Sequence, residues 1–174
     1  MASVRPLFSA AAIAARLETM AAEIAAAMPA EIVVAAVLKG SFMFAADLVR
    51  ALNRVGVATT VDFMRVSSYG ESIRSSGDVR IRFDLEVALA GRAVLIVDDI
   101  LDTGRTLAFV RELLGDRGAT LVKTCCLLDK PSRRETAIVA DFIGFTCPNL
   151  FVVGYGLDFG DRYRELPYVG VLEG

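Results

Sequence analysis

The chain has 174 residues, of which 55% are hydrophobic, and its 19 basic and 21 acidic residues give a net charge of −2 at pH 7. This length predicts one domain, residues 1–174, with a substantial core, and the slightly acidic balance argues against nucleic acid as the main partner. Because the chain has no histidine, Ser-His-Asp catalysis, Cys-His catalysis and histidine metal sites are excluded, and a carboxylate, Lys or Tyr must carry any proton transfer.

We expect neither a membrane span nor a disulfide framework. The longest uncharged run, residues 142–157, is broken by Gly144, Pro148 and Gly154, so it cannot form a spanning helix. Charged residues interrupt the alanine-rich N-terminal segment, which therefore does not fit a secretory signal. The three cysteines have no zinc spacing, and we expect them to be small core residues. A cytoplasmic enzyme fits these features best.

The first predicted helix covers residues 9–28, because Ile13, Leu17, Met20 and Ile24 recur at three- and four-residue spacing. Ser9 is its expected N-cap, and a proline ends it. This is an amphipathic helix that packs on the body of the domain, and we assign no chemistry to it.

Residues 32–38 are predicted to form the first buried strand, followed by Lys39-Gly40 and a helix from about Phe42 to Asn53. A lysine at the carboxyl end of a strand, beside a glycine that lets the backbone approach a ligand, suits an anion. By itself the pair is a weak signal, since a solvent-exposed lysine in a turn gives the same pattern.

A hairpin with a long polar tip is predicted next. Residues 59–66 form one strand, and residues 79–83 form the returning strand. Between them, residues 67–78 hold five serines and two glycines. This composition is typical of either a mobile lid or a plain surface loop.

The most informative stretch is residues 93–107. Its first five residues are apolar and predict a strand that is buried on both faces. The stretch then holds an acidic turn with Asp98, Asp99 and Asp102. Thr103-Gly104 separates this turn from an amphipathic helix that begins at Thr106.

Such a turn offers a ligand two features. Free N–H groups from Thr103 to Thr106, together with the helix dipole, suit a phosphate, and the adjacent acids suit hydroxyl groups or a divalent cation beside it. The alternative is that these three acids only solvate the end of the strand. It fits less well, because three carboxylates beside an anion site would repel the ligand unless that ligand also carries hydroxyl groups or a metal. A P-loop is excluded, because Asp99 stands at its required glycine and Arg105 at its lysine.

Residues 120–128 predict another buried strand, which ends in Asp129-Lys130-Pro131, and residues 151–158 predict the last strand and its exit. Lys130 has the same two interpretations as Lys39. Strands that alternate with helices, with ligand groups at the carboxyl ends of the strands, predict an α/β fold with a doubly wound, mostly parallel sheet.

Several motifs, in the right order between about residues 32 and 172, resemble type I phosphoribosyltransferases. The central stretch resembles their binding motif for phosphoribosyl diphosphate (PRPP): an apolar strand, two acids, two apolar residues, Asp, Thr-Gly and a hydroxyl residue. Other strings resemble the hypoxanthine-guanine branch of the family: Leu38-Lys39-Gly40-Ser41-Phe42, in which the Leu–Lys peptide is typically cis, Ser68-Tyr69-Gly70, Leu127-Leu128-Asp129-Lys130-Pro131 and Tyr163-Arg164-Glu165-Leu166-Pro167.

The resemblance implies a type I phosphoribosyltransferase fold with a flexible lid hairpin and a small hood from the terminal segments. It implies transfer of the phosphoribosyl group from PRPP to hypoxanthine or guanine with Mg²⁺, giving IMP or GMP and pyrophosphate. It also implies a cytoplasmic homodimer or homotetramer without nucleic-acid or membrane partners.

The family's site residues carry over to matching positions of this sequence. Asp102 is implied to take the proton of the purine nitrogen, and Asp98 and Asp99 to hold the ribose hydroxyls. The implied contacts of the PRPP ribose and phosphate are Asp98, Asp99, Asp102, Thr103, Gly104, Arg105 and Thr106, and those of pyrophosphate are Lys39, Gly40 and Arg164. The implied lid contacts are Ser68 and Tyr69, the purine contacts are Lys130, Phe151, Val152 and Asp158, and the metal ligands are Asp98, Asp99 and Asp158.

Two alternatives stay open. One is a xanthine-preferring enzyme, and the other is a PRPP-sensing regulator that binds nucleic acid. Such regulators typically have tyrosine at the position of Asp102, whereas the acid is present here. Asp98 stands where many relatives have Glu, and Arg105 stands at a position that varies between lysine and small residues, so both leave the affinity for PRPP open.

Overall fold

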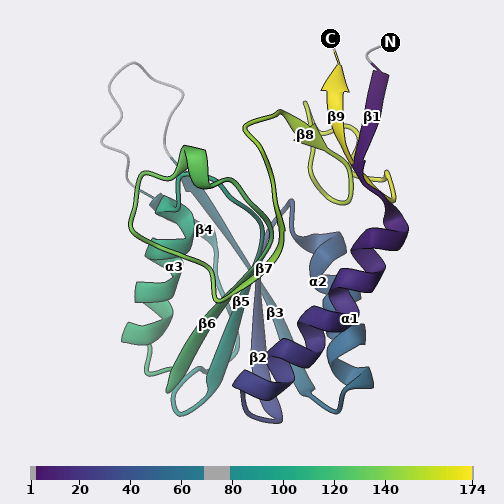
Figure 1. Cartoon of the computed structure of the whole chain (residues 1–174). Coiled ribbons are helices and arrows are strands. Elements are labelled where there is room, and N and C mark those ends of the chain that lie inside the picture. The colour runs from purple at the N-terminus through teal and green to yellow at the C-terminus, as the bar shows by residue number, and fades with distance from the viewer. Residues whose placement is uncertain (1–2, 69–78, 174) are drawn as a thin grey trace.

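A six-stranded sheet forms the centre of the fold, with the strand order β4-β3-β2-β5-β6-β7 (Figure 1). The computed structural model describes residues 3–68 and 79–173. The strands are β2 (Glu31–Val37), β3 (Ala58–Ser68), β4 (Val79–Phe83), β5 (Ala93–Leu101), β6 (Leu121–Asp129) and β7 (Phe142–Thr146). Only β4 runs antiparallel to its neighbour, which confirms the predicted doubly wound, mostly parallel sheet.

Helices cover both faces of this sheet, which explains the uninterrupted apolar runs of its inner strands. Helices α1 (Ala10–Ala27) and α2 (Phe42–Arg54) pack on the face that carries Val34 and Leu95. Helix α3 (Arg105–Asp116) packs on the opposite face, which carries Val33 and Val94. No helix within residues 3–68 and 79–173 is long and apolar enough to cross a membrane.

The order of the strands fixes where a ligand can bind. Strands β2 and β5 are parallel neighbours, and the chain proceeds from β2 to β3 on one side and from β5 to β6 on the other. Loops that leave the carboxyl ends of these two strands therefore diverge and leave a crevice between them. This is the edge at which the sequence places Lys39 and the acidic residues.

Two of the three acidic residues, Asp98 and Asp99, lie in a strand, so the predicted acidic turn is wrong in part. Strand β5 continues to Leu101, because Asp98 pairs with Cys126 and Ile100 pairs with Leu128 on β6. The ladder with β6 therefore fixes the backbone of Asp98 and Asp99, and the turn begins only at Asp102. Helix α1 matches its prediction, since Ser9 Oγ accepts a hydrogen bond from Ala12 N at 3.2 Å.

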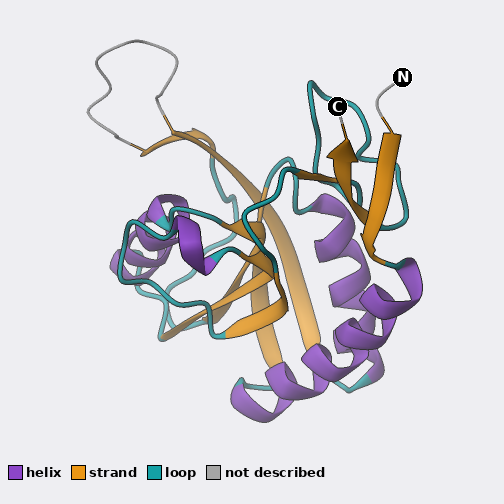
Figure 2. Cartoon of the chain, turned by 45° about the horizontal axis from the view of Figure 1, so that its top comes forward, coloured by secondary structure: helices purple, strands orange, loops and turns teal. Residues whose placement is uncertain are grey.

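A small antiparallel sheet of β1 (Ser3–Phe8), β9 (Val169–Glu173) and β8 (Val152–Val153) stands apart from the central one (Figure 2). It corresponds to the hood expected from the terminal segments. The expected strand over residues 151–158 is shorter, because the backbone turns at Gly154 and Gly156, whose φ angles are 95° and 99°. Strands β1, β7 and β9 were not predicted.

Candidate active site

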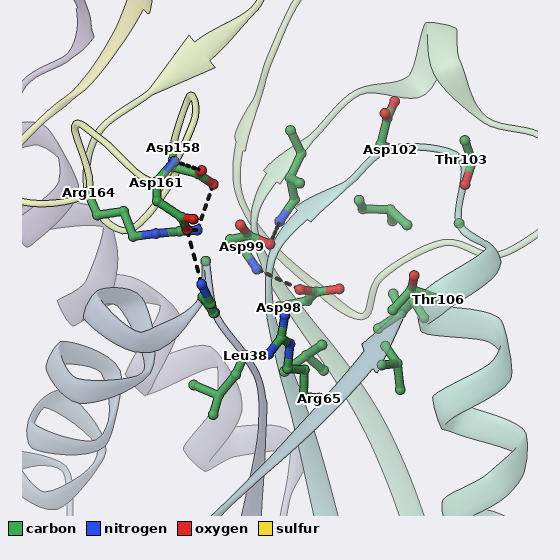
Figure 3. A pocket seen from close by; sticks show the side chains of 18 residues that line it. Leu38, Arg65, Asp98, Asp99, Asp102, Thr103, Thr106, Asp158, Asp161 and Arg164 are labelled. Atoms are coloured by element: carbon green, nitrogen blue, oxygen red, sulfur yellow. Dashed lines mark hydrogen bonds and ion pairs between the residues drawn. The ribbon is translucent and has the colours of Figure 1, made fainter. Parts of the chain in front are cut away.

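A cavity of about 740 Å³ opens at the carboxyl ends of β2 and β5, where the strand order predicts a ligand site (Figure 3). It brings together most of the residues that the sequence assigned to PRPP and pyrophosphate. These are Lys39, Gly40, Asp98, Asp99, Asp102, Thr103, Gly104, Thr106 and Arg164. Asp158, which was assigned to the purine and the metal, lines the cavity as well. Groups from three separate parts of the chain thus face one space.

The loop after β2 fits against β5 so closely that only glycine is possible at its centre. The Leu38–Lys39 peptide is cis, as the resemblance implied. A Cβ atom on Gly40 would overlap the Asp99 carboxylate, whose Cγ would lie 2.5 Å away. A Cβ on Gly156 would in turn overlap the carbonyl oxygen of Gly40. Three segments therefore interlock around Gly40.

Asp98 and Asp99 form an acidic pair at the floor of the cavity. Asp98 is 7% exposed, and its Oδ1 accepts a hydrogen bond from Asp99 N at 3.0 Å. Burial raises the pKa of Asp98 well above its usual value, and the neighbouring Asp99 carboxylate raises it further. Burial also raises the pKa of Asp99, although hydrogen bonds and the charge of Arg164 oppose this rise. A cation beside the pair would relieve its repulsion.

Opposite this pair, two cations converge on Asp161. Lys39 Nζ lies 3.0 Å from Asp161 Oδ1, and Arg164 Nη2 lies 3.3 Å from the same oxygen. These partners lower the pKa of the Asp161 carboxyl. Arg164 also pairs with Asp158 Oδ1 at 2.8 Å and donates to the Gly156 carbonyl at 2.6 Å. Asp161 escaped prediction because it lies in an irregular turn, with φ of 61°, and in no motif.

The loop before α3 lines a further side of the cavity. Gly104 has φ of 86° and precedes the first helical residue, so the helix N-terminus points its N–H groups toward the cavity side that Thr103 and Thr106 line. Arg105 is not among the side chains that line this cavity. Its Nη2 instead pairs with Glu135 Oε2 at 2.7 Å.

A second cavity, of about 430 Å³, adjoins the first and holds the predicted purine contacts. Lys130, Phe151 and Val152 line it, and Asp102 and Asp158 line both cavities. Lys130 is 9% exposed, and its Nζ donates to the Leu150 carbonyl at 2.7 Å. Phe151 is exposed and meets Phe159 edge to face, with ring centroids 5.6 Å apart. Asp102 therefore stands at the junction of the two spaces.

The expected metal ligands do not form a complete cage. Within the part of the chain that the structure describes, no group of three or more Cys, Asp or Glu residues could hold a metal ion together. Asp98 and Asp99 lie side by side, whereas Asp158 is paired with Arg164. A donor set of two carboxylates fits Mg²⁺, which usually takes its other ligands from water and substrate phosphates.

The predicted lid lies mostly outside the described residues. Ser68 is the last residue of β3, and Tyr69, like the rest of residues 69–78, falls outside them. The roles of Ser68 and Tyr69 stay predictions.

Comparison with known proteins gives concordant matches. The family model described as the phosphoribosyl transferase domain matches residues 4–160. Hypoxanthine phosphoribosyltransferase of Salmonella typhimurium is 52% identical over 140 residues, which are 80% of this chain and 77% of that protein. Hypoxanthine-guanine phosphoribosyltransferase of Bacillus subtilis is 51% identical over 137 residues, covering 79% and 74%. A solved structure of Trypanosoma cruzi hypoxanthine phosphoribosyl transferase superposes with a TM-score of 0.91 at 41% identity, covering 97% of this chain and 91% of that one.

Proposed function

The chain belongs to the phosphoribosyltransferase family, and we propose from this premise that it is a purine salvage enzyme acting on hypoxanthine or guanine. It transfers the phosphoribosyl group of PRPP to the base and releases IMP or GMP and pyrophosphate. The observation that carries this proposal is the junction of the two cavities at Asp102. A charged space suited to PRPP and a space suited to a planar base meet at one carboxylate.

The leaving pyrophosphate is held on the side of Lys39 and Arg164. Both cations already converge on an anionic oxygen, that of Asp161, so pyrophosphate can replace this carboxylate without rearranging the loop. The side chain of Asp161 is 72% exposed, so its carboxylate can be hydrated when pyrophosphate takes its place. Preorganised positive charge of this kind stabilises the negative charge that develops on a leaving group.

The rest of PRPP is proposed to follow the floor of the first cavity. The ribose hydroxyls bind Asp98 and Asp99, and the 5′-phosphate binds the N–H groups and hydroxyls between Thr103 and Thr106. Asp98 and Asp99 would also hold Mg²⁺, with Asp158 as a further ligand once it separates from Arg164. When bound, the ion neutralises charge on pyrophosphate and on the acidic pair.

The purine is proposed to lie in the second cavity, stacked on Phe151, with its edge read by the backbone near Val152. Lys130 donates to the 6-oxo group in place of the Leu150 carbonyl that it contacts in the structure. Asp102 accepts the proton that the purine nitrogen loses as its bond to the ribose carbon forms. By family resemblance we also expect a homodimer or homotetramer in the cytoplasm.

Initial rates with hypoxanthine, guanine and xanthine, each with PRPP and Mg²⁺, test this function directly. We expect turnover of the first two bases and slower turnover of xanthine. Turnover of xanthine alone would assign a xanthine-preferring enzyme. PRPP binding without turnover of any base, together with retention of RNA in a filter-binding assay, would assign a regulator instead.

Lys130→Ala is expected to raise the Michaelis constant of the base about 10- to 100-fold. The variant leaves the 6-oxo oxygen of the purine buried without a donor, which costs about 1–3 kcal/mol. The Michaelis constant of PRPP should change little. Lys39→Ala is the contrasting variant, since it should weaken PRPP and leave the base nearly unaffected. A Lys130→Ala defect confined to PRPP would move this lysine to the phosphate side of the site.

A further inference from the structure

The segment of residues 133–136, which we call the strap, lies against residues 102–106, which we call the phosphate loop. The backbone N–H groups of Glu135 and Thr136 both donate to the Thr103 carbonyl, at 2.9 and 3.2 Å. The loop fits closely against the chain that follows the strap, since a Cβ on Gly104 would lie 2.7 Å from Ile138 Cγ2. The strap is therefore a fixed part of the phosphate loop's surroundings.

Arg134 anchors the strap from within. Its guanidinium pairs with Asp129 at the end of β6, and the two side chains are only 16% and 12% exposed. Its Nη1 also donates to the Asp102 carbonyl at 3.2 Å. Arg134 thus connects the end of β6 to the backbone of Asp102. This connection fixes the backbone position of the preceding residue, Arg133.

That neighbour, Arg133, contacts the proposed base itself. Its Nε donates to Asp102 Oδ1 at 3.1 Å, across 31 positions of the sequence, and its side chain lines the purine cavity. Among the described residues, none donates to the second carboxylate oxygen of Asp102. The pair is half exposed, so it adds little to the stability of the fold. The contact can instead set the orientation of the Asp102 carboxylate.

We infer that Arg133 is a positioning residue for proton transfer in the purine cavity. It holds one oxygen of Asp102 and thereby presents the other oxygen to the nitrogen of the base. This inference rests on the proposed function, because it gives Asp102 the role of the base. A misplacement of about 1 Å in a reacting group can cost about 10²-fold in rate, so loss of this contact should act on turnover rather than on binding.

Kinetics of Arg133→Gln and Arg133→Lys test the inference. For Arg133→Gln we expect turnover to fall about 10- to 100-fold, with the Michaelis constant of PRPP unchanged, and for Arg133→Lys a partial recovery. Arg111→Gln, on the exposed face of α3, is the matched control and should keep normal turnover. A lower Michaelis constant for the base with unchanged turnover would mean that Arg133 only competes with the purine for Asp102, and would overturn the inference.

The double variant with Asp102→Asn separates positioning from a general structural role. If Arg133 acts through Asp102, adding Arg133→Gln to Asp102→Asn should change turnover less than about threefold, because coupled residues are not additive. A full multiplicative loss would assign Arg133 a separate role and overturn the inference alone. Normal turnover of Asp102→Asn by itself would overturn both the proposed base and the inference built on it.

Discussion

Asp102→Asn is expected to lower turnover with hypoxanthine about 10²–10⁴-fold, the usual contribution of a positioned general base. The amide keeps the shape of the side chain but cannot accept the proton of the purine nitrogen. Binding of PRPP should change little, because the amide fills the same space at the edge of the first cavity as the carboxylate. The backbone carbonyl of Asp102, which accepts the bond from Arg134, is untouched by the substitution.

Steady-state rates and PRPP binding by calorimetry check this result. Asp116→Asn, an exposed change near the end of α3, is the control and should behave as the parent protein. Turnover within about threefold of the parent would remove Asp102 from its role as a base. A loss of PRPP binding as large as the loss of turnover would make Asp102 a binding residue instead.

The central motif was predictable because its chemistry is local. One contiguous stretch holds Asp98, Asp99, Asp102 and the Thr103-Gly104 turn. The spacing of these residues after an apolar strand is enough to predict a site for PRPP. The cis peptide before Lys39 was predictable only by resemblance. Even in the central motif the extent of β5 was misjudged, since its last residues are held by pairing with β6, a partner that the local sequence does not reveal.

Several contacts that escaped prediction join distant parts of the chain. Arg133 reaches Asp102 across 31 positions, and Lys39 reaches Asp161 across 122. The hood likewise pairs β1 with β9, strands from opposite ends of the chain. Exposed arginines and aspartates outside any periodic element resemble ordinary surface residues, so only the folded arrangement identifies these as part of the site.

Gly40→Ala is expected to damage both activity and stability, because the added methyl group has no space. Its Cβ would lie 2.5 Å from Asp99 Cγ and overlap the carboxylate oxygen. The Asp99 carboxylate is itself fixed, since its Oδ1 accepts a hydrogen bond from Ile100 N at 3.0 Å. Either Asp99 must leave the acidic pair, or the loop of residues 38–41, which we call the pyrophosphate loop, must move away from Gly156. Overpacking of this kind costs about 1–3 kcal/mol, and a displaced loop should lower turnover about 10²-fold or more.

Thermal unfolding and initial rates measure the two effects, with Gly115→Ala as the matched control. A Cβ on Gly115 meets nothing within 4 Å, and alanine within a helix is favoured over glycine by about 0.5–1 kcal/mol. This control should therefore raise the melting temperature and keep normal turnover. Adding Asp99→Ala to Gly40→Ala removes the collision, so we expect the double variant to regain stability but not activity. A Gly40→Ala protein with normal melting temperature and turnover would show that the pyrophosphate loop is not held against Asp99 as the structure has it.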